Sequence, residues 1–347
     1  MDMKPEGNLI QICLLGVLLQ AFTSGAQPVT QIAAGCYHGR FLKSDGSLWA
    51  MGANYFGELG DGTYNTTNQP EQIVASNVMA IAAGGFHSLF LKSDGSLWAM
   101  GYNSDGELGD GTYNNTNQPE QIVASNVTAI AAGDLHSLFL KSDGSLWAMG
   151  NNDYGQLGDG SYNRTNRSEQ LVASNVTAIA AREFHSLFLK SDGSLWAMGW
   201  NYYGQLGDGT YDNTNQPEQI VASNVTAIAA GYLHSLFLKS DGSLWAMGWN
   251  YYGQLGDGTY NSTNRPEQIV INPGYNRISA QLLSGDNVSL SFFGIAGVNY
   301  ALDRSFSLAP PNWAPQMTNL AGAGGVLVFT NTPNPSTNNF WHIRSVP

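Results

Sequence analysis

The chain has 347 residues, of which 41 are glycine, 11% are aromatic and 12% are charged, and its net charge at pH 7 is −12. Few charges combined with many aromatic residues and glycines argue against disorder and favour an all-β protein. The negative charge opposes binding to nucleic acid or to an anionic membrane, because both require clustered Lys and Arg. We therefore expect neither kind of partner.

Residues 1–26 predict a secretory signal peptide. Lys4 gives a positive start, the apolar stretch runs from Leu9 to Phe22, and Ser24 and Ala26 are small residues before the cleavage point. An uncleaved anchor is the alternative, which the short apolar run disfavours. We expect a protein that is secreted or held at the cell surface or in the periplasm, with no membrane insertion after cleavage and no disulfide, because Cys13 falls in the leader.

One segment organises the chain. His87 to Gly101 reads His-Ser-Leu-Phe-Leu-Lys-Ser-Asp-Gly-Ser-Leu-Trp-Ala-Met-Gly. It recurs every 49 residues, at His136, His185 and His234, and a diverged first copy starts at His38. The lysine of the segment is also repeated and indicates a solvated turn position rather than a basic patch. The five lysines are Lys43, Lys92, Lys141, Lys190 and Lys239.

Each copy predicts a β-hairpin. The Asp-Gly pair at 94–95 separates two apolar runs, and such a tight turn requires positive φ. Because side chains alternate along a strand, Leu89 and Phe90 point to opposite faces, as do Leu97 and Trp98. Both faces are then apolar, which is typical of a sheet stacked between two similar sheets.

Residues 27–273 therefore predict an all-β propeller of about five four-stranded blades. Each unit adds Val-Thr-Ala-Ile-Ala-Ala-Gly before its hairpin and, after a glycine-rich loop, Pro-Glu-Gln-Ile-Val. A right-handed β-solenoid is the alternative. We expect the first strand, from Val29, to pair with the last, near 267–270, because that pairing would leave no open sheet edge.

The repeat resembles that of the regulator of chromosome condensation family. The resemblance rests on Gly-x-x-His-Ser-Leu, Asp-Gly-x-Leu-Trp-x-x-Gly and Asn-x-x-Gly-Gln-Leu-Gly-Asp-Gly, with close matches at 150–160 and 199–209, and it covers residues 29–271. It implies a β-propeller. The family's familiar members have seven blades, whereas this chain has five units, so a five-bladed ring is expected and an incomplete ring completed by another chain is the alternative.

Residues 274–347 break the period and predict a small β-sandwich-like domain, with 272–274 as the hinge. Strands are expected at 288–293, 300–302, 326–329 and 340–346. The segment resembles a small β module that ends many exported proteins of environmental bacteria, with Trp313 and 340–345 as its markers. The resemblance implies a bacterial, exported protein.

The repeated polar residues give no catalytic or cofactor site. Five histidines in register suggest a metal ring, but no His has a second ligand at a usual offset, so a structural role in each blade is favoured. The turn aspartates, such as Asp61, are calcium candidates without further carboxylates nearby. The glycine-rich loops lack the helix and Lys of a phosphate cradle. We expect no enzyme activity, no catalytic residue, no metal and no cofactor.

Positions that are identical in all repeats are those that the blade fold requires, and positions that differ between repeats are not constrained by it. Two groups of such positions differ most, namely the pair before each histidine and the segment before each Gly-Gln-Leu-Gly loop. The second group is rich in Trp and Tyr, which dominate contacts with proteins and sugars. Drift without function is the alternative. The candidate binding residues are Tyr55, Phe56, Tyr102, Tyr154, Trp200, Tyr202, Tyr203, Trp249, Tyr251 and Tyr252.

The sequence thus favours an exported, monomeric, non-enzymatic scaffold whose loops on one rim bind a protein or a polysaccharide. The family resemblance implies an alternative, which is guanine-nucleotide exchange on a small GTPase. A third hypothesis is a structural protein that the C-terminal module anchors to the cell surface.

Overall fold

The computed structural model describes residues 27–172 and 174–269, and beyond them six strands between 279 and 346. It divides into two compact units, Met1–Glu267 and Gln268–Pro347. The described residues form strands, turns and loops, and among them no helix is long and apolar enough to cross a membrane. The predicted signal peptide and the expected hinge at 272–274 lie outside the described residues.

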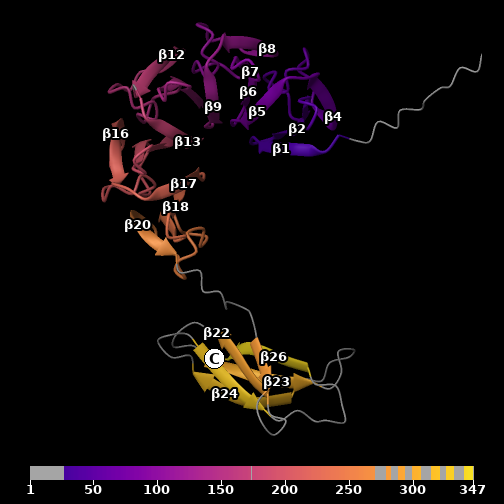
Figure 1. Ribbon diagram of the computed structural model, residues 1–347, viewed down its shortest axis with the longest axis vertical. Coiled ribbons are helices and arrows are strands. Elements are labelled where there is room, and N and C mark those ends of the chain that lie inside the picture. Colours follow the sequence, from indigo (N-terminus) through magenta and orange to yellow (C-terminus); the bar gives the residue numbers. More distant parts are fainter. Residues whose placement is uncertain are drawn as a thin grey trace, which may run out of the picture. The chain divides into compact units, whose positions relative to one another are not determined.

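The first unit consists of five antiparallel sheets of four strands each, the blades, coloured from indigo to orange in Figure 1. Blade 1 contains β1 (Val29–Ala34), β2 (His38–Lys43), β3 (Leu48–Gly52) and β4 (Thr67–Val74). Blade 2 contains β5 (Val78–Ala83), β6 (His87–Lys92), β7 (Leu97–Gly101) and β8 (Thr116–Val123). Blade 3 contains β9 (Val127–Ala132), β10 (His136–Lys141), β11 (Leu146–Gly150) and β12 (Thr165–Val172). Blade 4 contains β13 (Val176–Arg182), β14 (His185–Lys190), β15 (Leu195–Gly199) and β16 (Thr214–Val221). Blade 5 contains β17 (Val225–Ala230), β18 (His234–Lys239), β19 (Leu244–Gly248) and β20 (Thr263–Ile269).

The hairpin of each repeat has the predicted turn and two apolar faces. Gly95 has a φ of 78°, as the Asp-Gly turn requires. Leu89 packs with Phe139 of blade 3, whereas Phe90 packs with Leu42 of blade 1. Alternation along one strand therefore supplies the cores on both sides of a blade, and the β-propeller prediction is confirmed at the level of its blades.

A lysine covers the tryptophan of each hairpin. Lys92 Nζ lies 4.0 Å from the centroid of the Trp98 ring, and the Trp98 indole donates a 2.9 Å hydrogen bond to Ser96 Oγ. The same Lys–Trp pair recurs in the other four blades at 3.8 to 4.1 Å. The repeated lysine is thus held by a cation–π contact as well as lying in a turn, and this contact explains its place in every repeat.

The expected pairing of the first and last strands is not found in the described sheets. The fourth strand of each repeat pairs with the third strand of the same repeat, so every repeat completes its own sheet and no strand is left over. In addition, blades 1 and 5 do not pack on each other among the described residues, so each has one face that no other blade covers. Ile32 on blade 1 is 82% exposed and Leu238 on blade 5 is 40% exposed, whereas Leu140, the equivalent of Leu238 in blade 3, is buried.

The second unit has two three-stranded antiparallel sheets, with strand orders β21-β22-β25 and β24-β23-β26. Its strands are β21 (Ser279–Leu282), β22 (Val288–Phe293), β23 (Asn299–Ser305), β24 (Ala314–Leu320), β25 (Val326–Asn331) and β26 (Phe340–Val346). Leu290, Leu302 and Phe329 are buried. The four strands expected from the sequence are present, and β21 and β24 were not predicted.

Candidate binding surface

Each hairpin begins with a histidine, and in blades 1 to 4 this histidine links its blade to the next one. His136 Nε2 lies 2.8 Å from Ser186 Oγ, and that hydroxyl donates a 2.8 Å hydrogen bond to the Gln156 carbonyl. Because the serine proton is used by the carbonyl, Nε2 of His136 is the donor to the serine oxygen. Burial lowers the pKa of His136 to about 3, so its imidazole is neutral. The structural interpretation of the repeated histidines is confirmed.

The glycine-rich loops are held by an asparagine that occurs in every repeat. Asn201 Nδ2 donates a 3.0 Å hydrogen bond to Asp208 Oδ1, and Asn201 Oδ1 accepts a 3.0 Å bond from the Leu206 amide. Asp208 Oδ2 accepts a 2.7 Å bond from Thr210 Oγ1. Both carboxylate oxygens therefore serve the loop itself, and the turn aspartates have a structural role. The residues flanking this asparagine are the variable aromatic ones.

These aromatic residues join the loops of consecutive blades by one rule. The residue two places after the asparagine in one blade contacts the residue just before the asparagine in the next blade. Each such contact therefore packs an aromatic ring of one blade's loop against a ring of the next blade's loop. The three aromatic pairs are Phe56–Tyr102, Tyr154–Trp200 and Tyr203–Trp249, with ring centroids 4.9, 5.3 and 5.6 Å apart.

The aromatic residues form two groups. The smaller group lies on blades 1 and 2 and contains Tyr37, Phe56, Phe86 and Tyr102. The larger group, hereafter the aromatic surface, lies on blades 3 to 5 and contains Tyr154, Phe184, Trp200, Tyr202, Tyr203, Trp249, Tyr251 and Tyr252. Tyr55 is exposed and makes none of the ring contacts found among the described residues.

Tyr37, Phe86 and Phe184 were not among the candidate residues. Phe184 lies 5.0 Å from Tyr154 and 5.8 Å from Trp200, measured between ring centroids. All three belong to the variable pair before each histidine. The variability of these positions was therefore visible in the sequence, but the sequence did not show that the pair before each histidine contacts the segment before the glycine-rich loop.

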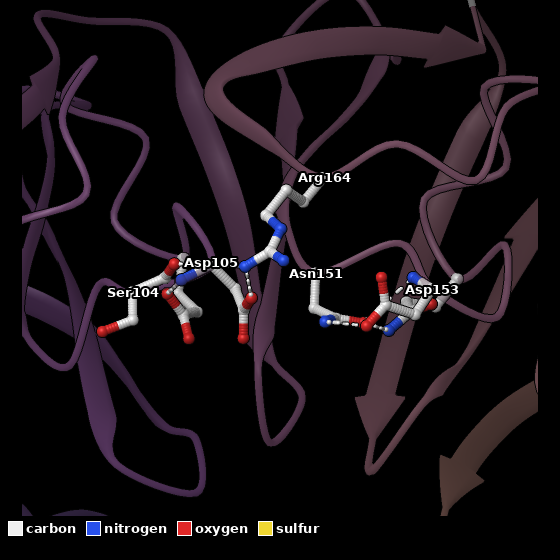
Figure 2. Close-up of polar contacts among 7 residues, drawn as sticks. Ser104, Asp105, Asn151, Asp153 and Arg164 are labelled. Atoms are coloured by element: carbon white, nitrogen blue, oxygen red, sulfur yellow. Dashed lines mark hydrogen bonds and ion pairs between the residues drawn. The ribbon is translucent and has the colours of Figure 1, made fainter.

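A polar junction separates the two aromatic groups (Figure 2). At the boundary between blades 2 and 3, the two positions that are aromatic elsewhere hold Asp105 and Asn151. Arg164 Nη1 lies 2.5 Å from Asp105 Oδ1, and Asn151 Nδ2 donates a 3.0 Å hydrogen bond to Asp153. Both aromatic positions are thus replaced together by polar residues, and these residues find polar partners.

The aromatic surface remains accessible in the chain. Tyr202, Tyr251 and Tyr252 are 64%, 66% and 73% exposed, and Trp200 and Trp249 are half-buried beside them. The rings contact one another, and these contacts already restrict the side chains, so binding a partner would cost little further side-chain entropy. Such a surface suits a partner that offers apolar or planar groups.

Comparison with known proteins gives one family. The family described as RCC1-like domain matches residues 12–293. The structure resembles that of human WBSCR16, with 26% identity, a TM-score of 0.64 and coverage of 72% of this chain and 68% of that one. It also resembles Prp20p from Saccharomyces cerevisiae, with 23% identity, a TM-score of 0.63 and coverage of 77% and 72%, a likeness of fold alone. No curated protein matches the chain.

Proposed function

The chain belongs to the RCC1-like domain family, and from that premise we propose that it is an exported, non-enzymatic scaffold that binds a protein partner through the aromatic surface. The observation that carries the proposal is the continuous set of ring contacts from Tyr154 to Tyr252 across blades 3 to 5. The export step rests on the sequence of residues 1–26.

The aromatic surface differs from the aromatic residues that build the blades. Phe188 is fully buried, and Trp196 is held by Ser194 and covered by Lys190. Trp200 and Trp249, in contrast, stand at positions that are Ala, Tyr or Asn in the other repeats. The blade fold does not require tryptophan at these positions, so binding of a partner explains the two residues better than packing within the blade does.

A protein partner is favoured over a polysaccharide by the similar structures. Prp20p was characterised for its binding to Gsp1p and histones, and yeast RCC1 was solved bound to Kap60. For this chain the net charge of −12 favours a neutral or basic partner. Guanine-nucleotide exchange is the alternative, and acceleration of nucleotide release from candidate small GTPases by the purified chain would support it instead.

The test replaces Trp200, Tyr203, Trp249 and Tyr252 together by Ala and measures recovery of partners from native envelope and medium. A matched control replaces four exposed loop tyrosines outside the ring contacts, Tyr113, Tyr162, Tyr211 and Tyr260. We expect recovery to fall at least about tenfold for the first variant only, since losing several central aromatic contacts costs well over about 1.4 kcal/mol. Equal recovery by both folded variants would refute the proposal, and loss of a glycan rather than a protein would reassign the partner.

Anchoring through the C-terminal unit is tested separately. A chain without residues 275–347 should be released into the medium if that unit holds the protein at the surface. A truncated protein that still fractionates with cells would exclude an anchoring role.

A further inference from the structure

The turn before each histidine brings residues of different blades together. The Cys36 amide donates a 3.3 Å hydrogen bond to the Gly85 carbonyl, and the Asp134 amide donates one of 3.3 Å to the Glu183 carbonyl. Cys36 Sγ lies 3.9 Å from Asp134 Oδ2, which joins blade 1 to blade 3. The turn cluster, as defined here, contains Cys36, Asp134, Arg182, Glu183 and Tyr232.

Blade 4 departs from the repeat at this cluster. Arg182 stands where the other four repeats have glycine, and a Cβ on Gly133 would lie only 2.2 Å from Cε1 of His136. In blade 4 the strand is longer and pairs Arg182 with His185. Glu183 follows with a φ of 44°, a left-handed conformation that is strained for a residue with a side chain. Blade 4 thus places an arginine where the other blades keep glycine, followed by Glu183 at a position that holds Asp134 in blade 3 and Tyr232 in blade 5.

When both carboxyl groups are ionised, two carboxyl oxygens of the cluster lack hydrogen-bond donors among the described residues. Glu183 is only 6% exposed, and its Oε2 has no donor. Asp134 Oδ1 has none either, and its contact with Arg182 Nε is a 3.6 Å ion pair without a hydrogen bond. A protonated Glu183 hydrogen-bonds with Asp134, and this bond is lost when Glu183 ionises. Buried acceptors without donors are rare in folded proteins, so the ionised pair calls for a ligand that brings donors.

We propose that the turn cluster binds the ammonium group of a lysine side chain of the protein partner, an inference that rests on the proposed function. An ammonium group carries three donors and a compact charge, so one group can serve both Glu183 Oε2 and Asp134 Oδ1. Tyr232, which is half-exposed and interacts with Glu183, lies beside the same carboxyl group.

The charges around Glu183 give this site a pH dependence. Burial, reinforced by Asp134, raises the pKa of Glu183 to about 8, while Arg182 acts in the opposite direction. Burial also raises the pKa of Tyr232 and of Cys36, so both stay neutral. A bound ammonium group favours the Glu183 carboxylate, whose proton then passes to solvent. Affinity should rise as pH increases from 6 to 8, by up to about a hundredfold.

The experiment measures binding of two blocked pentapeptides, Gly-Gly-Lys-Gly-Gly and its Nε-acetyl-lysine form, to the full chain by calorimetry near pH 6 and pH 9. We expect the lysine peptide to bind more tightly at the higher pH, and acetylation to weaken it at least about tenfold. Equal binding of the two peptides, or no binding of either, would overturn the proposal without any need for a variant.

Variants then locate the site. Glu183→Gln should weaken lysine binding near pH 9 at least about tenfold and remove its pH dependence, because the neutral amide has no charge to gain. Glu218→Gln is the matched control, since Glu218 also has a raised pKa but lies on the outer strand β16. A pH dependence that survives in folded Glu183→Gln would contradict the assignment. The aromatic-surface variant leaves the cluster intact, so loss of partner capture in that variant tests the proposed function independently.

Discussion

His136 of blade 3 and Ser186 of blade 4 are joined by a buried 2.8 Å hydrogen bond, and the same bond links three other pairs of consecutive blades. The serine in turn donates to a loop carbonyl of the histidine's own blade. These bonds fix the rotation of one blade on the next, and therefore the spacing of the loops that carry the aromatic surface.

Replacing His136 by Ala should lower the free energy of unfolding by about 2–4 kcal/mol, because a buried bond is lost and a cavity remains. His234 begins the hairpin of blade 5, is only half-buried, and has no following blade among the sheets that the structure describes. His234→Ala should therefore cost less than about 1 kcal/mol. Urea denaturation of both variants checks the difference, and equal losses would show that the link between blades carries no stability.

Stability should be greatest near pH 6.5. Burial lowers the pKa of four histidines to about 3 to 4 in the folded chain, and lowers that of His234 as well. Below pH 6.5 the unfolded chain therefore binds more protons, and the free energy of unfolding falls as pH falls, by up to about 1.4 kcal/mol per pH unit for each of the four. Burial raises the pKa of Glu107 and Glu183 to about 8, so the opposite dependence operates between pH 4.5 and 8. The four histidines are His38, His87, His136 and His185.

Below pH 6.5 the contribution of the four histidines exceeds that of the two glutamates, and above pH 6.5 the contribution of the glutamates is the larger. Urea midpoints measured near pH 5, 6.5 and 8 should therefore be highest at the middle value. A midpoint that increases steadily from pH 5 to 8 would contradict the raised carboxyl pKa values.

Glu107→Gln should stabilise the chain by on the order of 1–3 kcal/mol near neutral pH. Glu107 is fully buried, and its Oε1 has no hydrogen-bond partner among the described residues. The other repeats show what the site accepts, because Gln156 fills the same position and accepts a 3.1 Å bond from the Tyr154 amide. Thermal unfolding compares the variant with the parent, and a lower melting temperature would refute the expectation.

A matched pair of isoleucines tests whether the first blade is uncovered in solution. Ile130 packs in the core between blades 2 and 3, whereas Ile32, its equivalent in blade 1, is 82% exposed. Ile130→Asp should cost at least about 3 kcal/mol, because it buries an unpaired charge, and Ile32→Asp less than about 0.5 kcal/mol. A similar loss in both variants would mean that blade 5 or a second chain covers the face of blade 1.

The sequence predicted what is local and periodic. The hairpin turns and the two apolar faces follow from alternation within one repeat, as Leu89 and Phe90 illustrate. The sequence did not show which repeat the fourth strand joins. The expected closure is not found among the described sheets, because the fourth strand of each repeat pairs with the third strand of the same repeat.

The candidate surface was predicted only in part for a related reason. Which variable positions face one another depends on the rotation between blades, and a linear sequence does not show it. The pairing of Tyr154 with Trp200, and its polar counterpart at Asp105 and Asn151, emerged only from the structure. Phe184 was missed because its contact with Trp200 joins two loops of the same blade that are distant in the chain.

The aromatic surface itself is tested most directly by 19F NMR of the chain labelled with 5-fluorotryptophan. Trp200 and Trp249 lie in the aromatic surface, whereas the five blade tryptophans donate hydrogen bonds to serines beneath their lysines. On addition of the captured partner, the resonances of Trp200 and Trp249, assigned by Trp200→Phe and Trp249→Phe, should shift or broaden while those of the blade tryptophans stay in place. A saturated complex in which these two resonances do not change would contradict the account.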